Sequence, residues 1–168
     1  MISNSQLSRM LLCMGFLEQE ISNLLLTLAQ AFEGSDEAKA ILIYVGLDSL
    51  KHANLLEQSA KVLLRDVEVD LENCRDLVGT ELVNLIKHIR EETEELAKGP
   101  ISMEEARKLI EEQTKMEGQL GEEYLNMCQA KALSLIATSK VVKKILELIS
   151  EDEERHLKLL ETALGYLP

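Results

Sequence analysis

Apolar side chains recur along most of this chain at alternating three- and four-residue spacing, which is the pattern of an amphipathic helix. Strand-like alternation of apolar and polar positions is absent, and proline occurs only at Pro100 and Pro168. These features predict an all-α protein. A chain of 168 residues can bury a substantial core, so we expect one domain over residues 1–168.

Start and stop signals divide this pattern into four long helices and one shorter helix. The expected helices span about 3–32, 37–64, 81–98, 102–133 and 138–165. The strongest signals are the Gly99-Pro100 stop and the capping box that Ser102 forms with Glu105 directly after it.

The lengths of the connections predict how the helices are arranged. Short turns favour two antiparallel hairpins, at about 3–65 and 102–168. The segment of about 66–101 between them is long and partly helical. It is therefore expected to run the length of the molecule, as in a four-helix bundle with one long crossover.

Each long helix has one apolar face, and polar residues interrupt every such face near its middle. The interruptions are Glu18 in the first helix, Ser49 and His52 in the second, Gln113 and Glu117 in the third, and Glu153 and His156 in the fourth. A carboxylate inside a bundle is costly unless it is paired or bound to a cation. Carboxylates and imidazoles are ordinary metal ligands, and Glu153 and His156 share a helix face. The pattern therefore indicates an internal metal site.

The two halves of the chain resemble each other around these polar positions. The segments that align are 48–57 (DSLKHANLLE) with 152–161 (DEERHLKLLE), and 17–31 with 116–130. Each half thus offers a glutamate on its first helix and an Asp-x-x-x-His on its second. The alignment places Glu18 opposite Glu117, and so favours Glu18 over the nearby Glu20 as a ligand.

These residues resemble the signature of the ferritin-like superfamily, and within it of the rubrerythrin-like di-iron carboxylate proteins. In that family, a Glu on the first and third helices and a Glu-x-x-His on the second and fourth surround two irons. The metal ligands that the resemblance implies are Glu18, His52, Glu117, Glu153 and His156. It also implies that Asp152 orients His52 and that Asp48 orients His156.

The second helix departs from the family pattern, because Ser49 stands where a glutamate is expected. In the family that glutamate commonly bridges the two metals. Its replacement removes one negative charge and leaves a position that water or an outside carboxylate can occupy. Asp48 could also turn toward the metal, but Asp152 occupies the equivalent place beside a retained Glu153, which favours an orienting role for Asp48.

The remaining ligands define two metal positions of unequal strength. The first would be held by Glu117, Glu153 and His156, and the second, weaker one by Glu18, His52 and a shared Glu153. Tyr124 follows Glu117 by two turns on the same face. It either packs in the core with its hydroxyl hydrogen-bonded, or lies next to the metals.

The resemblance implies an iron-binding protein, with manganese or zinc as alternatives. Fe(II) would react with O2 or peroxide, in ferroxidase or peroxidase-like chemistry. No CxxC electron-transfer module is present, so an enzyme of this kind would need a separate electron donor. The alternative is a metal-free bundle that acts as a structural, oligomerisation or protein-interaction module. In either case the chain could form a homo-oligomer.

Net charge and cysteine content limit which partners and which cellular compartment are expected. A net charge of −12 argues against a nucleic-acid partner. No apolar run approaches the roughly 20 residues of a membrane span, and no signal peptide is recognised. The cysteines, Cys13, Cys74 and Cys128, are odd in number and scattered. We expect ordinary buried thiols in a reducing cytoplasm.

Overall fold

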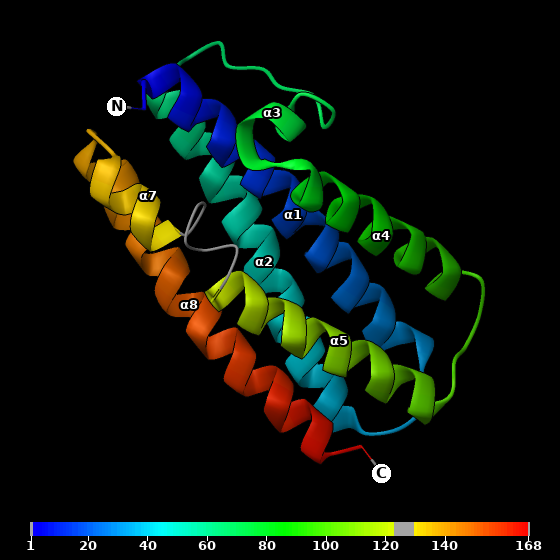
Figure 1. Cartoon of the computed structure of the whole chain (residues 1–168). Coiled ribbons are helices and arrows are strands. Elements are labelled where there is room, and N and C mark those ends of the chain that lie inside the picture. Colours follow the sequence, from blue (N-terminus) through cyan, green and yellow to red (C-terminus); the bar gives the residue numbers. More distant parts are fainter. Residues whose placement is uncertain (1, 123–129, 168) are drawn as a thin grey trace.

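The computed structural model of the chain consists of helices and their connections over the residues that it describes (Figure 1). These are residues 2–122 and 130–167, without the side chains of 116–132. The helices are α1 (Asn4–Ala31), α2 (Asp36–Leu63), α3 (Cys74–Val78), α4 (Thr80–Leu96), α5 (Met103–Glu122), α7 (Ala130–Ile136) and α8 (Lys140–Gly165). The expected all-α fold class is confirmed.

The caps of the helices follow directly from the sequence. The Ser3 hydroxyl accepts a hydrogen bond from the Gln6 N–H at 3.1 Å, and the Gln6 side chain accepts one from the Ser3 N–H at 3.0 Å. Ser102 and Glu105 form the same reciprocal pair, at 3.2 and 2.8 Å, and begin α5. The Ser139 side chain caps α8. These residues satisfy N–H groups that would otherwise lack partners at the helix ends.

Helices α1 and α2 form a closely packed antiparallel hairpin (Figure 1). The buried Ser8 hydroxyl donates a hydrogen bond to the carbonyl of Ala60, at 2.8 Å, and so links the two helices at one end. At Gly46 a Cβ atom would lie 3.0 Å from the side chain of Leu26. Glycine therefore allows an approach that a larger residue would resist.

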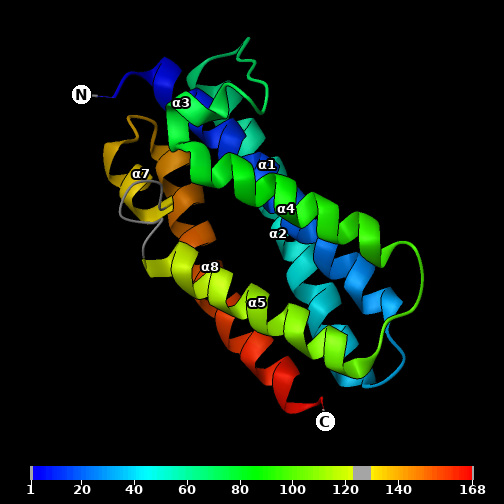
Figure 2. The same ribbon diagram turned by 45° about the vertical axis from the view of Figure 1, so that its right-hand side comes forward.

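The connection from α2 to α5 returns along α1 (Figures 1 and 2). It contains an irregular stretch, α3, and then α4, which begins after Gly79 at a φ of 97° that favours glycine. Arg90 of α4 pairs with Glu20 of α1 at 2.7 Å. At the far end, the N–H of Ile101 donates to the carbonyl of Ala31 at 2.8 Å. Helix α5 therefore starts beside the C-terminal end of α1.

The second half of the chain packs on the hairpin mainly through α8. Helix α8 lies against α2, α5 and α7. The helix expected over 102–133 corresponds to α5 and α7, and residues 123–129 between them lie outside the described part. Over the described residues, α1 and α5 do not pack closely along their lengths. That packing would complete a closed four-helix bundle.

The predicted apolar faces form the core. Buried stripe positions include Leu11, Leu25 and Leu28 of α1, Leu42 and Leu56 of α2, Ile110 of α5, and Leu146 and Leu160 of α8. The polar interruptions lie within the same stripes, and Ser49, His52, Gln113 and His156 are buried with them. The periodicity thus identified the inward faces, because burial on a helix follows its 3.6-residue period.

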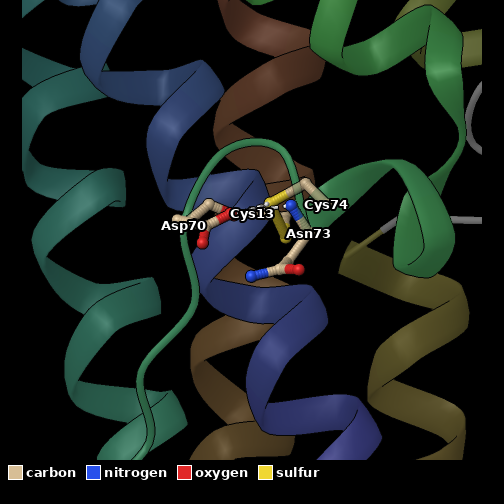
Figure 3. The surroundings of a disulfide bond; sticks show 4 residues. All are labelled: Cys13, Asp70, Asn73 and Cys74. Atoms are coloured by element: carbon tan, nitrogen blue, oxygen red, sulfur yellow. Dashed lines mark hydrogen bonds between the residues drawn. A yellow bond between two sulfur atoms is a disulfide. The ribbon is translucent and has the colours of Figure 1, made fainter.

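A disulfide joins Cys13 of α1 to Cys74 of α3, with 5.7 Å between their Cα atoms (Figure 3). The expectation that these two cysteines are ordinary thiols is therefore wrong. Sequence spacing could not reveal the pair, because 61 residues separate them and only the returning connection brings them together. Such bonds are rare in the cytosol outside hyperthermophiles, so this one counts against an ordinary reducing compartment.

Helix α1 is long and apolar enough, by length and composition alone, to cross a membrane. It is the single helix of the described chain that meets this test. The sequence analysis found no such run, because polar residues are scattered along the helix. Core helices of soluble proteins meet the same test, and α1 packs on both α2 and α4. This feature is therefore weak evidence for a membrane span.

Candidate metal centre

Two reciprocal hydrogen bonds join α2 and α8 where the helices face each other. Because the helices are antiparallel, His52 lies opposite Asp152 and His156 lies opposite Asp48. The Nε2 atom of His52 is 3.0 Å from Oδ2 of Asp152. The Nε2 atom of His156 is 2.9 Å from Oδ2 of Asp48. The two imidazole rings stack with their centroids 5.4 Å apart. Both contacts that the resemblance implied are therefore present.

These contacts decide which nitrogen of His52 is available. A carboxylate only accepts hydrogen bonds, so Nε2–H of His52 donates to Asp152. Its Nδ1 atom is buried, has no hydrogen-bond partner among the described residues, and lies 3.8 Å from Oε1 of Glu18 on α1. Metal-bound histidines usually hold their second ring nitrogen to a carboxylate in this manner. Nδ1 of His52 is thus placed to bind a proton or a metal ion near Glu18.

Lys51 links the two aspartates across the helix pair. Its Nζ atom is 2.9 Å from Oδ2 of Asp152, and it also pairs with Asp48 one turn earlier on its own helix. Arg155 forms an ion pair with Asp152 from α8. The sequence analysis did not assign Lys51 a role. The alignment that places it opposite Arg155 was the available signal, because cations at both positions suggest anions beside them.

The cations and imidazoles keep both aspartates ionised. Burial favours the protonated form of Asp152, but hydrogen bonds from Lys51 and His52 outweigh it and lower its pKa to about 2. Burial acts in the same way on Asp48. There the hydrogen bonds from Lys51 and His156 prevail, and its pKa is also lowered. Two ionised carboxylates therefore hold the outer nitrogens of the two histidines.

The two histidines respond differently to this environment. Burial disfavours the charged form of His52, but the carboxylate of Glu18, with help from Asp152 and Asp48, raises its pKa above the ordinary value. Burial lowers the pKa of His156, and repulsion from His52 adds to the effect against the hydrogen bond to Asp48. The space beside Nδ1 of His52 therefore favours a positive charge.

Glu153 occupies the same inner region, one turn before His156 on α8. Burial raises its pKa to about 8, and the negative charge of Glu18 adds to the rise against an opposing effect of His52. At neutral pH, its carboxyl group thus holds a proton in the metal-free protein. A bound cation would replace that proton and relieve the repulsion between the two glutamates.

Two further polar atoms from the stripes have no hydrogen-bond partner in the part of the chain that the structure describes. The hydroxyl oxygen of Ser49 is buried without a hydrogen-bond partner, one turn before His52. The Oε1 atom of Gln113 on α5 is also buried and lacks such a partner. A buried polar atom of this kind is destabilising unless a water, ion or ligand satisfies it. Three of the five unpartnered buried atoms of the described residues thus belong to the polar positions of the stripes, and the other two are the hydroxyl oxygens of Ser22 and Ser59.

A second candidate group of metal ligands shares His52 with the first. Among the described residues, Asp48, His52 and Asp152 bring one ligand atom each within 4.8 Å of one another. Both carboxylates already pair with Lys51, so a cation there would compete with an ammonium group. The inner group of Glu18, Glu153 and Nδ1 of His52 has no such competitor in the described residues. We therefore treat the aspartates as partners of the histidines.

The other expected site residues have separate outcomes. The side chain of Glu117 and the whole of Tyr124 lie outside the described residues, so their expected places in the site stay predictions. Glu20, the rejected alternative to Glu18, points to α4 and pairs with Arg90. The preference for Glu18 came from the internal repeat, and Glu18 is the glutamate that lies near His52.

Comparisons of the whole chain with protein-family models, with curated proteins and with solved structures find no match.

Proposed function

We propose that this chain is a ferritin-like metal-binding protein that holds iron between α1, α2, α5 and α8. The ligands in this proposal are Glu18, His52, Glu117, Glu153 and His156. Bound Fe(II) would supply electrons to O2 or peroxide, in ferroxidase or peroxidase-like chemistry with a separate electron donor. Manganese and zinc are the alternative occupants, because they accept the same oxygen and nitrogen ligands.

The observation that carries the proposal is the orientation of His52. Its outer nitrogen donates to Asp152, while its buried inner nitrogen faces Glu18 and has no hydrogen-bond partner among the described side chains. A histidine that served only packing would be expected to satisfy both nitrogens or to expose one. The raised pKa of Glu153 also supports a metal site, because a cation between Glu153 and Glu18 would offset the repulsion between them.

The residues of the chain have distinct tasks in this arrangement. Asp152 and Asp48 fix the ring orientation of the histidines, and Lys51 holds the two aspartates together. Glu153 exchanges its proton for the metal, so metal affinity is expected to rise with pH. The buried leucines around the layer exclude water, which strengthens each electrostatic contact within it.

The test is the metal content of the protein after anaerobic reconstitution with Fe(II), measured by elemental analysis. The wild-type chain is expected to retain one or two irons, and the double variant Glu153→Ala/His156→Ala is expected to retain none. Glu151→Ala/Glu154→Ala is the matched control, because these exposed glutamates lie on the same helix and should leave the iron content unchanged. Equal iron in wild type and the Glu153/His156 variant would refute the proposal.

One observation favours the metal-free alternative, a bundle that serves as an interaction or oligomerisation module. Lys51 already balances the charge of both aspartates without any metal. A module of this kind would bind no iron above the control, and its melting temperature would not change with a chelator. A chelator-sensitive melting temperature would favour the metal-binding function.

A further inference from the structure

The contacts between α2 and α8 follow an approximate local two-fold relation. Exchanging the two segments turns the His52–Asp152 contact into the His156–Asp48 contact. The residues exchanged are Asp48 with Asp152, Ser49 with Glu153, and His52 with His156. The sole unlike pair is Ser49 with Glu153, so the site holds a carboxylate on one side and a hydroxyl on the other.

The hydroxyl group of Ser49 lacks a hydrogen-bond partner among the described residues. A glutamate carries a carboxymethyl group where serine carries a hydroxyl, so Ser49 is the smaller side chain by that group. Its oxygen is fully buried and has no hydrogen-bond partner among the described residues, and neither has Nδ1 of His52 one turn away. No described side chain therefore satisfies either atom.

We propose that a small monocarboxylate of the size of formate or acetate binds beside Ser49 and supplies the missing carboxylate to the metal site. The inference rests on the metal-binding function proposed above. Acetate is the carboxymethyl group itself with one added hydrogen, so it matches the missing volume. The Ser49 hydroxyl can donate a hydrogen bond to it, which would satisfy the orphaned oxygen.

The charge of the site favours an anion once two metals are present. Two divalent cations carry four positive charges, whereas the proposed ligands include three glutamates and two neutral imidazoles. One monoanion would neutralise the remainder. With a single metal, the glutamates already match or exceed its charge, and an added anion would be repelled. Carboxylate binding is therefore expected to be linked to binding of the second metal.

The experiment is a titration of the metal-free protein with Co(II) in a carboxylate-free buffer, followed by visible absorption. It is repeated with formate, with acetate and with pivalate, whose branched chain is larger than the carboxymethyl group that serine lacks. Formate and acetate are expected to tighten binding of the second Co(II) by about tenfold and to change its spectrum. Pivalate is expected to do neither.

Variants at position 49 show whether the effect arises there. Ser49→Glu is expected to bind two Co(II) without acetate and to ignore added acetate. Ser49→Gln fills the same volume without a charge, so it should lose the acetate response and gain no metal. Ser49→Ala keeps the small side chain but removes the hydroxyl donor, so it should keep the response at higher acetate concentration. Circular dichroism checks that each variant folds, and the carboxylate size series on the wild type stands without them.

The outcomes separate the two proposals. If Co(II) binds to wild type through Glu153 and His156 but formate and acetate change nothing, the carboxylate inference is wrong and the metal site remains. If pivalate acts as well as acetate, or Ser49→Gln keeps the response, the anion binds elsewhere and the inference is also wrong. If no Co(II) binds above the Glu153→Ala/His156→Ala control, both proposals fail.

Discussion

Among single residues, Glu153 and His52 have raised pKa values, which shows that their surroundings favour positive charge. The glutamate keeps a proton that its solution counterpart would lose, and the histidine keeps one more readily than usual. Burial is the main cause of the raised pKa of Glu153, and the negative charge of Glu18 contributes to the rise at both residues. A cation bound between these side chains would satisfy all three at once.

The pKa of Glu153 leads to a prediction for the metal-free protein. Its folded pKa of about 8 lies above its ordinary value of 4.5, so between these limits the folded state holds a proton that the unfolded state lacks. Stability should therefore fall as pH rises through this window, by on the order of 3 kcal/mol. Glu153→Gln, which mimics the protonated acid, should weaken this pH dependence in urea melts. Glu154→Gln is the exposed control and should retain it.

Asp152 gives the opposite prediction in acid. Its folded pKa of about 2 lies below its ordinary value of 3.8, so its contribution is present above about pH 4 and is lost as pH falls toward 2. Its side chain borders solvent, so we expect the contribution to be about 1 kcal/mol. Asp152→Asn should lower stability at pH 6 by this amount and lose less than wild type during acidification. If the stability of wild type and variant fell equally during acidification, the effect could not be assigned to Asp152.

The sequence predicted which polar residues lie in the inward-facing stripes better than it predicted their contacts. Glu18, Ser49, His52 and His156 lie in the stripes that periodicity identified, because a helix face is determined by spacing alone. The internal repeat chose Glu18 over its neighbour. The sequence analysis assigned no role to Lys51, since a lysine one residue before a core histidine is usually a solvent-exposed charge, and its alignment with Arg155 was the one signal. Only the approach of α8 brings Asp152 within its reach.

At the scale of elements, the helices and their starts follow from local signals. Ser3, Ser102 and Ser139 form their caps with residues three positions later, so the sequence contains each complete motif. Contacts across the returning connection are different. The pairing of Cys13 with Cys74 and of Arg90 with Glu20 depends on where α3 and α4 pack, which no local pattern specifies.

The disulfide predicts a loss of stability on reduction. It closes a long loop, and such a crosslink stabilises by about 2–4 kcal/mol, mainly by restricting the unfolded chain. Cys13→Ser/Cys74→Ser should therefore unfold at lower urea concentration, and dithiothreitol should lower the midpoint of wild type but not of the variant. Two of the three cysteines are paired, so thiol titration of denatured wild type should find one reactive group. Three reactive thiols would show that the disulfide is absent.

At the scale of the whole molecule, the candidate site connects the two halves of the chain. Its described groups come from α1, α2 and α8, and the packing of α8 on α2 is the extensive contact between the first hairpin and the second half. A metal bound there would therefore oppose separation of the halves. It would act in the same direction as the ion pairs of Lys51 with Asp48 and Asp152.

Zinc, which has no redox chemistry, tests this coupling directly. At a free concentration near 100 times its dissociation constant, a ligand of the folded state stabilises by about 2.7 kcal/mol. For a chain of this size, that corresponds to a rise of about 5–10 °C in the melting temperature. The Glu153→Ala/His156→Ala variant should show no rise in differential scanning calorimetry. An equal rise in both proteins would place the zinc elsewhere.

The disulfide also changes what a broken backbone would mean for this protein. Residues 64–73 form the irregular stretch between its two cysteines, and connections of this kind are where proteases cut most readily. A chain cut there would consist of two polypeptides, yet Cys13 lies in one and Cys74 in the other. The nicked molecule would migrate as a single species on a non-reducing gel and as two fragments after reduction. Proteolysis would thus convert this one-chain protein into a covalent heterodimer.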